Sequence, residues 1–245
     1  MTELVVRHDE DGLAWLTLNR PEKLNALTVG LFQALRRHII DLKKDESVKC
    51  VILRGAGKCF SAGHDLGDIA DGEAVPSPGW HSETLRLMEK LPKPVIAAVH
   101  GHCYTGALEV ALAADFILAA QSAKFADTHA KWALTPIWGM SQRLPRRVGT
   151  ATAKRLMFTA ETVRADAALR MGLCEAVFED ETFESDLRAF ARQILANSVF
   201  SHAANKRLLD ATDAGPMDAG LQWEVMEHEG VGPDMQARIA AFMKR

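Results

Sequence analysis

Glu109 is the residue whose surroundings point most clearly to chemistry. Counting His as neutral, it is the only charged side chain between Pro94 and Ala114, and no Lys or Arg lies three or four residues away. Burial of such a carboxylate is costly, and desolvation raises its pKa toward neutral pH. A carboxyl group of this kind can exchange protons under physiological conditions. The alternative is that Glu109 lies on the exposed stripe of an amphipathic helix.

Two glycine-containing loops could supply hydrogen-bond donors to a reacting oxygen. Gly106 lies about one turn before Glu109, at an expected helix start, where backbone N–H groups are unpaired. Such a helix start can donate to an oxyanion, although Gly106 alone is better explained as a turn after a strand. The loop 55–67 could expose another N–H at Gly63-His64, and it does not fit a nucleotide-binding P-loop. Two donors with one lone carboxylate would suit acyl transfer or enolisation, but nothing local shows that the two loops meet.

The elements that must position these residues alternate between strands and helices in the first half of the chain. Thr28 can cap a helix that runs to about Lys44, and another helix begins near Gly106. We expect buried strands at residues 13–18, 50–53, 94–99 and 115–119. This alternation predicts an α/β fold with mainly parallel strands.

The pattern after Thr150 is almost entirely helical. A lone strand is expected at 176–178, and the composition shifts near Thr182. We expect helices at 151–159, 164–171, 182–196 and 200–211, followed by two more that extend to the last residue. The sequence therefore predicts a core at 1–181 and a helical C-terminal region at 182–245.

Composition excludes several classes of function. The chain has 245 residues and a formal net charge of -3, which gives no indication of a nucleic-acid partner. Its four cysteines form no CxxC pair, so neither a zinc site nor a redox motif is indicated. The N-terminus has no apolar core of signal-peptide length, and no apolar run reaches the roughly 18 residues of a membrane span. We expect a cytoplasmic protein with no membrane association.

Six motifs, in order and with the spacing of one family, resemble the enoyl-CoA hydratase/isomerase (crotonase) family. They are NRPEKLNAL at 19–27, FSAGHDL at 60–66, KPVIAAVHG at 93–101, QRLPRRVG at 142–149, ADAALRMGL at 165–173 and AFMKR at 241–245. The resemblance implies a spiral of ββα repeats with a C-terminal helical trimerisation region. It also implies an acyl-CoA substrate, no metal or redox cofactor, and a homotrimer or homohexamer.

The resemblance also assigns roles by motif position. The backbone N–H groups of His64 and Gly106 would form the oxyanion hole for the thioester carbonyl. The residues that would lie along the CoA path are Lys23, Leu24, Ala62, Asp65, Leu66 and Lys244. For Lys244 the alternative is a terminal charge without a ligand.

The chain departs from the family pattern at its second catalytic carboxylate. Glu109 falls on one of the two glutamate positions of the hydratases, and His129 stands at the other, twenty residues later. A neutral imidazole can accept or donate a proton, so Glu109 and His129 could perform hydration together. The alternative is that His129 only packs or hydrogen-bonds. Asp127 is a further candidate, and we expect it to position the loop.

Three tryptophans, Trp80, Trp132 and Trp138, are expected to shape an acyl pocket, the alternative being packing in the core or at a subunit interface. The segment 68–80 is rich in Pro and Gly and suits a lid. The leading hypothesis is an enoyl-CoA hydratase-like enzyme with Glu109 as its acid/base. Isomerase, decarboxylase or hydrolase activity is the alternative because of His129. A non-catalytic CoA-binding scaffold is the last possibility.

Overall fold

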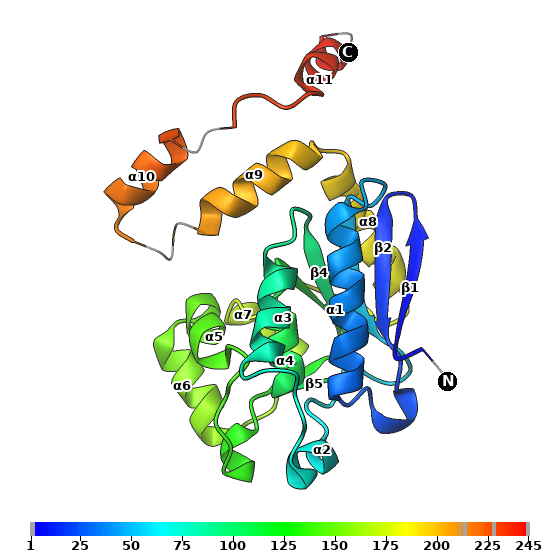
Figure 1. Cartoon of the computed structure of the whole chain (residues 1–245), viewed down its shortest axis with the longest axis vertical. Coiled ribbons are helices and arrows are strands. Elements are labelled where there is room, and N and C mark those ends of the chain that lie inside the picture. The colour runs from blue at the N-terminus through cyan, green and yellow to red at the C-terminus, as the bar shows by residue number, and fades with distance from the viewer. Residues whose placement is uncertain (1–2, 211, 213–214, 227–228, 244–245) are drawn as a thin grey trace.

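A six-stranded sheet forms the centre of the molecule (Figure 1). The structure is a computed structural model that describes residues 3–210, 212, 215–226 and 229–243. In spatial order the strands are β1 (Val5–Glu10), β2 (Leu13–Leu18), β3 (Cys50–Gly55), β4 (Val95–Val99), β6 (Phe116–Ala120) and β9 (Ala176–Phe178). β1 and β2 form an antiparallel hairpin, and every later pair in this sheet is parallel. The expected parallel α/β core is therefore present.

Both faces of the sheet are buried, which explains the nearly continuous apolar runs of its central strands. On one face Trp15, Ile52 and Leu118 pack against Leu187 and Ile194 of α8 (Phe183–Leu195). The opposite face packs against the helices α1 (Val29–Lys44), α3 (Trp80–Glu89) and α4 (Gly106–Leu112). Because α8 covers one face of the sheet, its apolar side chains belong to the central core. The domain boundary between residues 181 and 182 stays a prediction.

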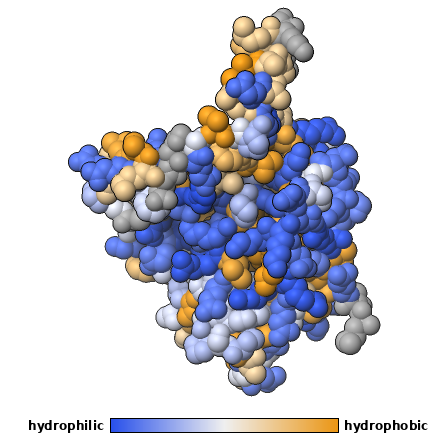
Figure 2. Space-filling model, turned by 45° about the horizontal axis from the view of Figure 1, so that its top comes forward, coloured by the Kyte–Doolittle hydropathy of each residue, from blue (hydrophilic) through white to orange (hydrophobic). Residues whose placement is uncertain are grey.

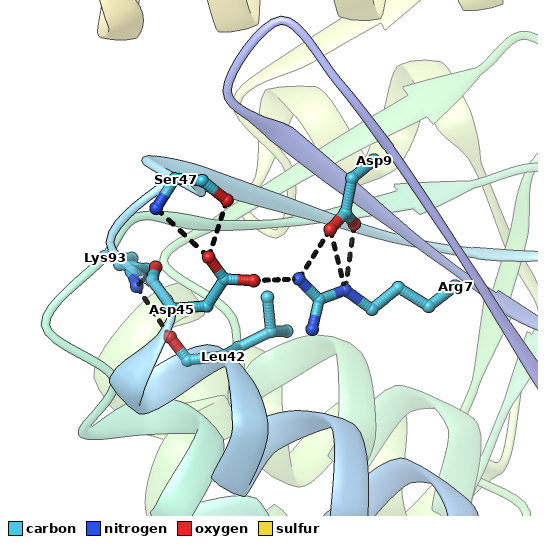
Figure 3. Close-up of polar contacts among 6 residues, drawn as sticks. All are labelled: Arg7, Asp9, Leu42, Asp45, Ser47 and Lys93. Carbon is cyan, nitrogen blue, oxygen red and sulfur yellow. Dashed lines mark hydrogen bonds and ion pairs between the residues drawn. The ribbon is translucent and has the colours of Figure 1, made fainter.

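The helix α1 begins and ends where its sequence predicts. The Thr28 side chain accepts a hydrogen bond from the backbone N–H of Leu31, at 3.2 Å, and thereby caps the helix. At the other end, the buried ammonium group of Lys93 donates to the carbonyl oxygens of Leu42 and Asp45, at 2.6 and 2.5 Å (Figure 3). The Asp45 carboxylate also pairs with Arg7 of β1, so this network joins the helix to the edge strand.

A second, smaller sheet lies near the carboxyl ends of the main strands. It contains β5 (His102–Tyr104), β7 (Lys124–Ala126) and β8 (Val163–Arg164), in that order. The helical elements of this region are η1 (Pro21–Lys23), α2 (Leu66–Asp71), η2 (His129–Trp132), α5 (Met140–Val148), α6 (Thr150–Thr159) and α7 (Ala165–Arg170). The sequence did not predict β1, β5 or α5, and residue 164, expected in a helix, pairs in β8.

Of the last three helices, the first lies beside the sheet, where its Lys206 pairs with Asp115 just before β6, while the other two lie farther out (Figure 1). They are α9 (Val199–Asp210), α10 (Met217–Met226) and α11 (Met235–Phe242), and none of them buries a residue. Apolar side chains are exposed on this segment, which is visible as orange surface in Figure 2. Within the described ranges, no helix combines the length and the apolar character that crossing a membrane requires.

Candidate active site

The two glycine-containing loops meet because the loop after β3 pairs directly with the segment that leads into α4. The loop after β3 pairs on one side with Leu27, whose backbone N–H donates to the Gly63 carbonyl at 2.8 Å. On its other side, the Ser61 N–H donates to the His102 carbonyl of β5 at 2.9 Å. Gly63 therefore lies beside the turn that leads into α4.

Asn25 fixes this junction from inside the protein. Its fully buried side chain donates to the carbonyl oxygens of Ala56 and Cys59 and accepts from the Arg20 N–H. The Asn25 carbonyl accepts from the Ser61 hydroxyl at 2.8 Å. Sequence reasoning assigned no role to Asn25, although an Asn within an apolar motif is a usable signal for a buried hydrogen-bonding group.

The backbone N–H groups of His64 and Gly106 lie next to each other, and their role as an oxyanion hole stays a prediction. A Cβ atom placed on Gly106 would lie 3.3 Å from the His64 nitrogen and 2.5 Å from a ring carbon of Trp138. Only glycine therefore fits at this contact. Within the described part of the chain, neither N–H group is paired with an acceptor. Two unpaired donors on one cavity wall are suited to bind a developing oxyanion.

Thr105 holds the Gly106 peptide in an unusual conformation. Its φ of 53° and ψ of -109° lie in a region that residues with side chains rarely adopt. The Thr105 N–H donates to the Ala126 carbonyl at 2.8 Å, and its hydroxyl accepts from the Thr128 N–H at 3.0 Å. These bonds to the segment after β7 stabilise the strained turn and set the direction of the next N–H.

Glu109 is 2% exposed and lies one turn into α4. Its Oε1 accepts from the backbone N–H groups of Trp138 and Met140, at 2.9 and 3.0 Å. Burial raises the pKa of Glu109, although these bonds and the nearby His129 act in the opposite direction. The expected isolation of this carboxylate is therefore correct along its own helix, and its hydrogen-bond donors come from the start of α5 and the segment just before it.

His129 faces Glu109 from η2. Its Nε2 lies 3.9 Å from Glu109 Oε2, and its Nδ1 lies 2.6 Å from Asp127 Oδ1. Burial alone would lower the pKa of His129, but the hydrogen bond to Asp127 and the charges of both carboxylates raise it. With the Nδ1 proton donated to Asp127, Nε2 is directed toward Glu109 and the cavity. Asp127 thus positions the imidazole as well as the loop.

These groups line one cavity of about 470 Å³. The predicted site residues that border it are Ala62, His64, Leu66, Gly106, Glu109, His129, Trp132 and Trp138. A carboxylate, an imidazole and two free N–H groups therefore share one enclosure that is large enough for a small organic group.

The profile of the enoyl-CoA hydratase/isomerase family matches residues 8–242. The chain belongs to this family. It is 35% identical to a crotonyl-CoA hydratase of Syntrophomonas wolfei, over 99% of both chains. It is 31% identical to a 1,2-epoxyphenylacetyl-CoA isomerase of Escherichia coli, over 100% of this chain and 97% of that one. The solved structure of an enoyl-CoA hydratase from Bacillus anthracis matches with a TM-score of 0.92 and 30% identity, over 98% of this chain and 96% of that chain.

The fold is accordingly the crotonase fold of the enoyl-CoA hydratase/isomerase family, with its C-terminal helical region. The resemblance to this family and the predicted fold class are both confirmed. The relatives named here include a hydratase and an isomerase, so family membership leaves the reaction to be argued from the site.

Two of the expected site residues, Trp80 and Asp65, do not line this cavity. Trp80 is buried at the start of α3 and packs on Phe32 and His81, so it does not line the cavity. Asp65 does not line it either, because its carboxylate caps α2 at Gly67 and pairs with Arg20. The CoA-binding roles of Asp65, Lys23 and Leu24 stay predictions, and Lys244 lies outside the described residues.

Metal ligation has no candidate within the ranges that the structure describes. No group of three or more His, Cys, Asp or Glu side chains there could hold a metal ion. The four cysteines are free and buried, and burial raises the pKa of each thiol, so none is an activated nucleophile.

Proposed function

We propose that this chain adds water across the 2,3 double bond of an enoyl-CoA thioester, with Glu109 as base and His129 as acid. The family supplies the class of substrate. The observation that carries the proposal is the placement of Glu109 Oε2 and His129 Nε2 at 3.9 Å, in the cavity that also holds two unpaired N–H groups. This arrangement contains a proton acceptor, a proton donor and an oxyanion site.

The thioester carbonyl would accept from the N–H groups of His64 and Gly106. Glu109 would remove a proton from water as the water oxygen attacks C3, and the electron pair of the double bond would move to the thioester oxygen. His129 would then give its Nε2 proton to C2 as the enolate collapses. Transfer of the proton from Glu109 to His129 would restore both groups. Hydration transfers no electrons, so this proposal requires no redox cofactor.

Raised pKa values suit these two roles. The raised pKa of Glu109 makes it a stronger base than an ordinary carboxylate, while the raised pKa of His129 keeps its imidazole protonated closer to neutral pH. In the active state Glu109 would be ionised and His129 would be protonated. Activity would therefore decline at low pH as Glu109 is protonated, and at high pH as His129 loses its proton.

The test is incubation with crotonyl-CoA, longer 2-enoyl-CoAs, 3-enoyl-CoAs and methylmalonyl-CoA, with each product followed by mass. A gain of one water on the 2-enoyl thioesters is expected, and Glu109→Gln should lower kcat/KM by about 10²–10⁴-fold. The exposed Glu224 on α10 provides the control variant Glu224→Gln, which should retain full activity. Full activity in Glu109→Gln would exclude the proposed base.

The second candidate is isomerisation or decarboxylation through the same enolate. The observation that favours it is the identity of residue 129, since His129 stands where the hydratases have their second glutamate and Glu109 is the only one of those two glutamates present. Loss of carbon dioxide from methylmalonyl-CoA, or conversion of a 3-enoyl thioester at constant mass, would establish this reading. Either result without any hydration would replace the first proposal.

We further propose that the chain assembles into a homotrimer or homohexamer through its C-terminal helices. The helices α10 and α11 expose apolar side chains that monomeric proteins usually cover, among them Leu221, Val225 and Phe242. A second copy of the chain would bury them.

A further inference from the structure

Three large apolar side chains at the cavity of Glu109 and His129 are exposed to solvent, and the proposed hydration gives them no role. They are Leu66, Trp132 and Ile137, which all line the cavity and are 48%, 54% and 70% exposed. Single exposed apolar residues are common on protein surfaces, but several gathered at one cavity mark the place of a ligand or a partner. Trp132 is the largest of the three, and no other tryptophan of the chain is as exposed.

The indole of Trp132 lies beside the proposed acid because both residues belong to one turn of 3₁₀ helix. η2 begins at His129 and ends at Trp132. Side chains three residues apart eclipse each other in a 3₁₀ helix, so the indole and the His129 imidazole lie on one side of η2, and both line the cavity. The backbone N–H groups of Ala133 and Leu134 donate to the His129 carbonyl and hold the end of this turn. A group on the acyl chain close to the reacting carbon atoms would therefore meet the indole.

Several polar side chains of the cavity wall lie against one another. Glu73 Oε2 lies 3.0 Å from His64 Nε2, and Glu73 Oε1 lies 3.7 Å from Nε2 of the buried His81. The Thr105 hydroxyl lies 2.5 Å from the Thr128 hydroxyl. Because these polar groups face each other, much of the wall that is left to an acyl group is apolar or aromatic.

We propose that Trp132 forms an aryl subsite, so that the preferred substrates are acyl-CoA thioesters with an aromatic ring at C3 or C4 of the acyl chain. An indole attracts a second aromatic ring, by offset stacking or edge contact, beyond what apolar burial provides, whereas a linear alkyl chain gains only the burial. The cavity has room for a ring, since benzene fits a space of about 150 Å³ and this cavity holds about 470 Å³. The inference rests on the proposed function for the placement of the acyl group, but not for the hydration step.

The test compares two saturated thioesters that differ only in the aromaticity of the ring, 3-phenylpropanoyl-CoA and 3-cyclohexylpropanoyl-CoA, together with the corresponding four-carbon pair. None of them can be hydrated, and titration calorimetry measures the binding of each. The cyclohexyl ring has at least as much apolar surface, so burial alone would favour it. The wild-type protein is expected to bind the phenyl member about fivefold more tightly at the chain length that reaches Trp132. Trp132→Leu should lose this preference, and Trp132→Phe, which keeps an aromatic face, should retain part of it.

The control is Phe158→Leu, which removes an exposed aromatic side chain of α6 that does not line the cavity and should leave the preference unchanged. Circular dichroism shows whether each variant is folded. Equal binding of both members by the wild-type protein, as expected if a second copy of the chain covers Trp132 instead, would overturn the subsite. No binding of either member, or a preference that persists in Trp132→Leu, would overturn it as well. A phenyl preference in a protein that hydrates no enoyl thioester would refute only the hydratase proposal, whereas hydration without that preference would refute only the subsite.

Discussion

Burial of Glu109 and its proposed role as a base favour opposite protonation states of the same carboxyl group. Its burial disfavours the ionised form, and that form is the one that the proposed base requires. We therefore expect Glu109→Gln to lose most of its activity and yet to be more stable than the wild-type protein at neutral pH, by about 1 kcal/mol. The amide oxygen can still accept from the N–H groups of Trp138 and Met140, so the loop before α5 keeps its anchor.

The pH dependence of this difference follows from the direction of the pKa shift. A carboxyl group whose folded pKa is raised stabilises the folded state below the unfolded value, about 4.3, and loses that contribution as the pH rises through the folded pKa. The advantage of Glu109→Gln should therefore shrink on acidification toward pH 4. Thermal unfolding of both proteins across this range checks it. An equal or larger gap at low pH would show that desolvation of Glu109 is not the cause.

Asp127 offers a second test at this scale, through the charge of His129. Its hydrogen bond and its negative charge both raise the pKa of His129. In Asp127→Asn that pKa should fall, so the alkaline limb of the kcat/KM profile should move to lower pH and activity at neutral pH should fall about tenfold. Asp41→Asn, which changes an exposed carboxylate on α1, is the control. An alkaline limb that stays in place in Asp127→Asn would mean that His129 is not the acid.

Glu109 could be found from the sequence because its isolation is visible within its own helix. The partners that define its chemistry could not, because Trp138 and Met140 lie about thirty residues later and reach it only in the folded chain. Glu73 gave no signal for the same reason. It lies in a Pro- and Gly-rich turn that resembles an ordinary exposed loop, and only the folded structure brings it to His64 and His81.

Among the elements, the turn from β5 into α4 has a strained backbone at Thr105, and its effect on activity can be measured. The Thr105 hydroxyl contacts Thr128 and accepts from its N–H, which holds the unusual backbone before Gly106. Thr105→Val keeps the branched shape and removes these bonds, so the Gly106 N–H should point less accurately at the oxyanion. We expect kcat to fall about tenfold, with little change in KM. Thr105→Ser should retain most of the activity, and a loss confined to KM would contradict this role.

The hydrogen bonds of Lys93 at the end of α1 should contribute to the stability of the protein but not to its activity. Lys93 precedes β4, whereas the site follows that strand, so the two lie at opposite ends of the parallel sheet. Lys93→Met removes both ammonium hydrogen bonds and should lower the free energy of unfolding by about 2 kcal/mol. Urea unfolding measures this loss, while kcat/KM of the folded variant should be unchanged. An unaltered midpoint would show that the two carbonyl oxygens find other donors.

Central elements were easier to predict than peripheral ones, for physical reasons. β2, β3 and β4 are buried on both faces, and their apolar runs follow directly from that burial. β1 is an edge strand with charged residues, so its alternation is weak. Pro145 within α5 contradicts helix propensity, and the packing of that helix against α4 and α6 overrides it.

On the scale of the whole molecule, the family motifs could be read from the sequence, but the contact between the two glycine-containing loops could not be predicted from it. That meeting depends on Asn25 and on pairing between segments that lie far apart in the chain. Local propensity contains no information about such contacts, and the motif order supplied it only through resemblance. The C-terminal helices show the reverse case, since their helical pattern was clear while their lack of buried side chains became visible only in the fold.

The exposed apolar face of α10 leads to the last prediction. Leu221 and Val225 are four residues apart, so they share one side of the helix, and they are 54% and 78% exposed. If a second copy covers them, light scattering should give the wild-type protein a mass of three or six times 26.9 kDa. Leu221→Glu combined with Val225→Glu should reduce the mass to that of one chain, because two buried charges would oppose association.

Gln193→Glu is the control, because it adds a charge at an exposed position of α8, outside the C-terminal helices, and its assembly should be unchanged. The melting temperature of the wild-type protein should also rise with its concentration, since association stabilises the folded chain by mass action, and the double variant should lose this dependence. A single-chain mass for the wild-type protein would refute the assembly. An unchanged mass in the double variant would place the interface on other residues.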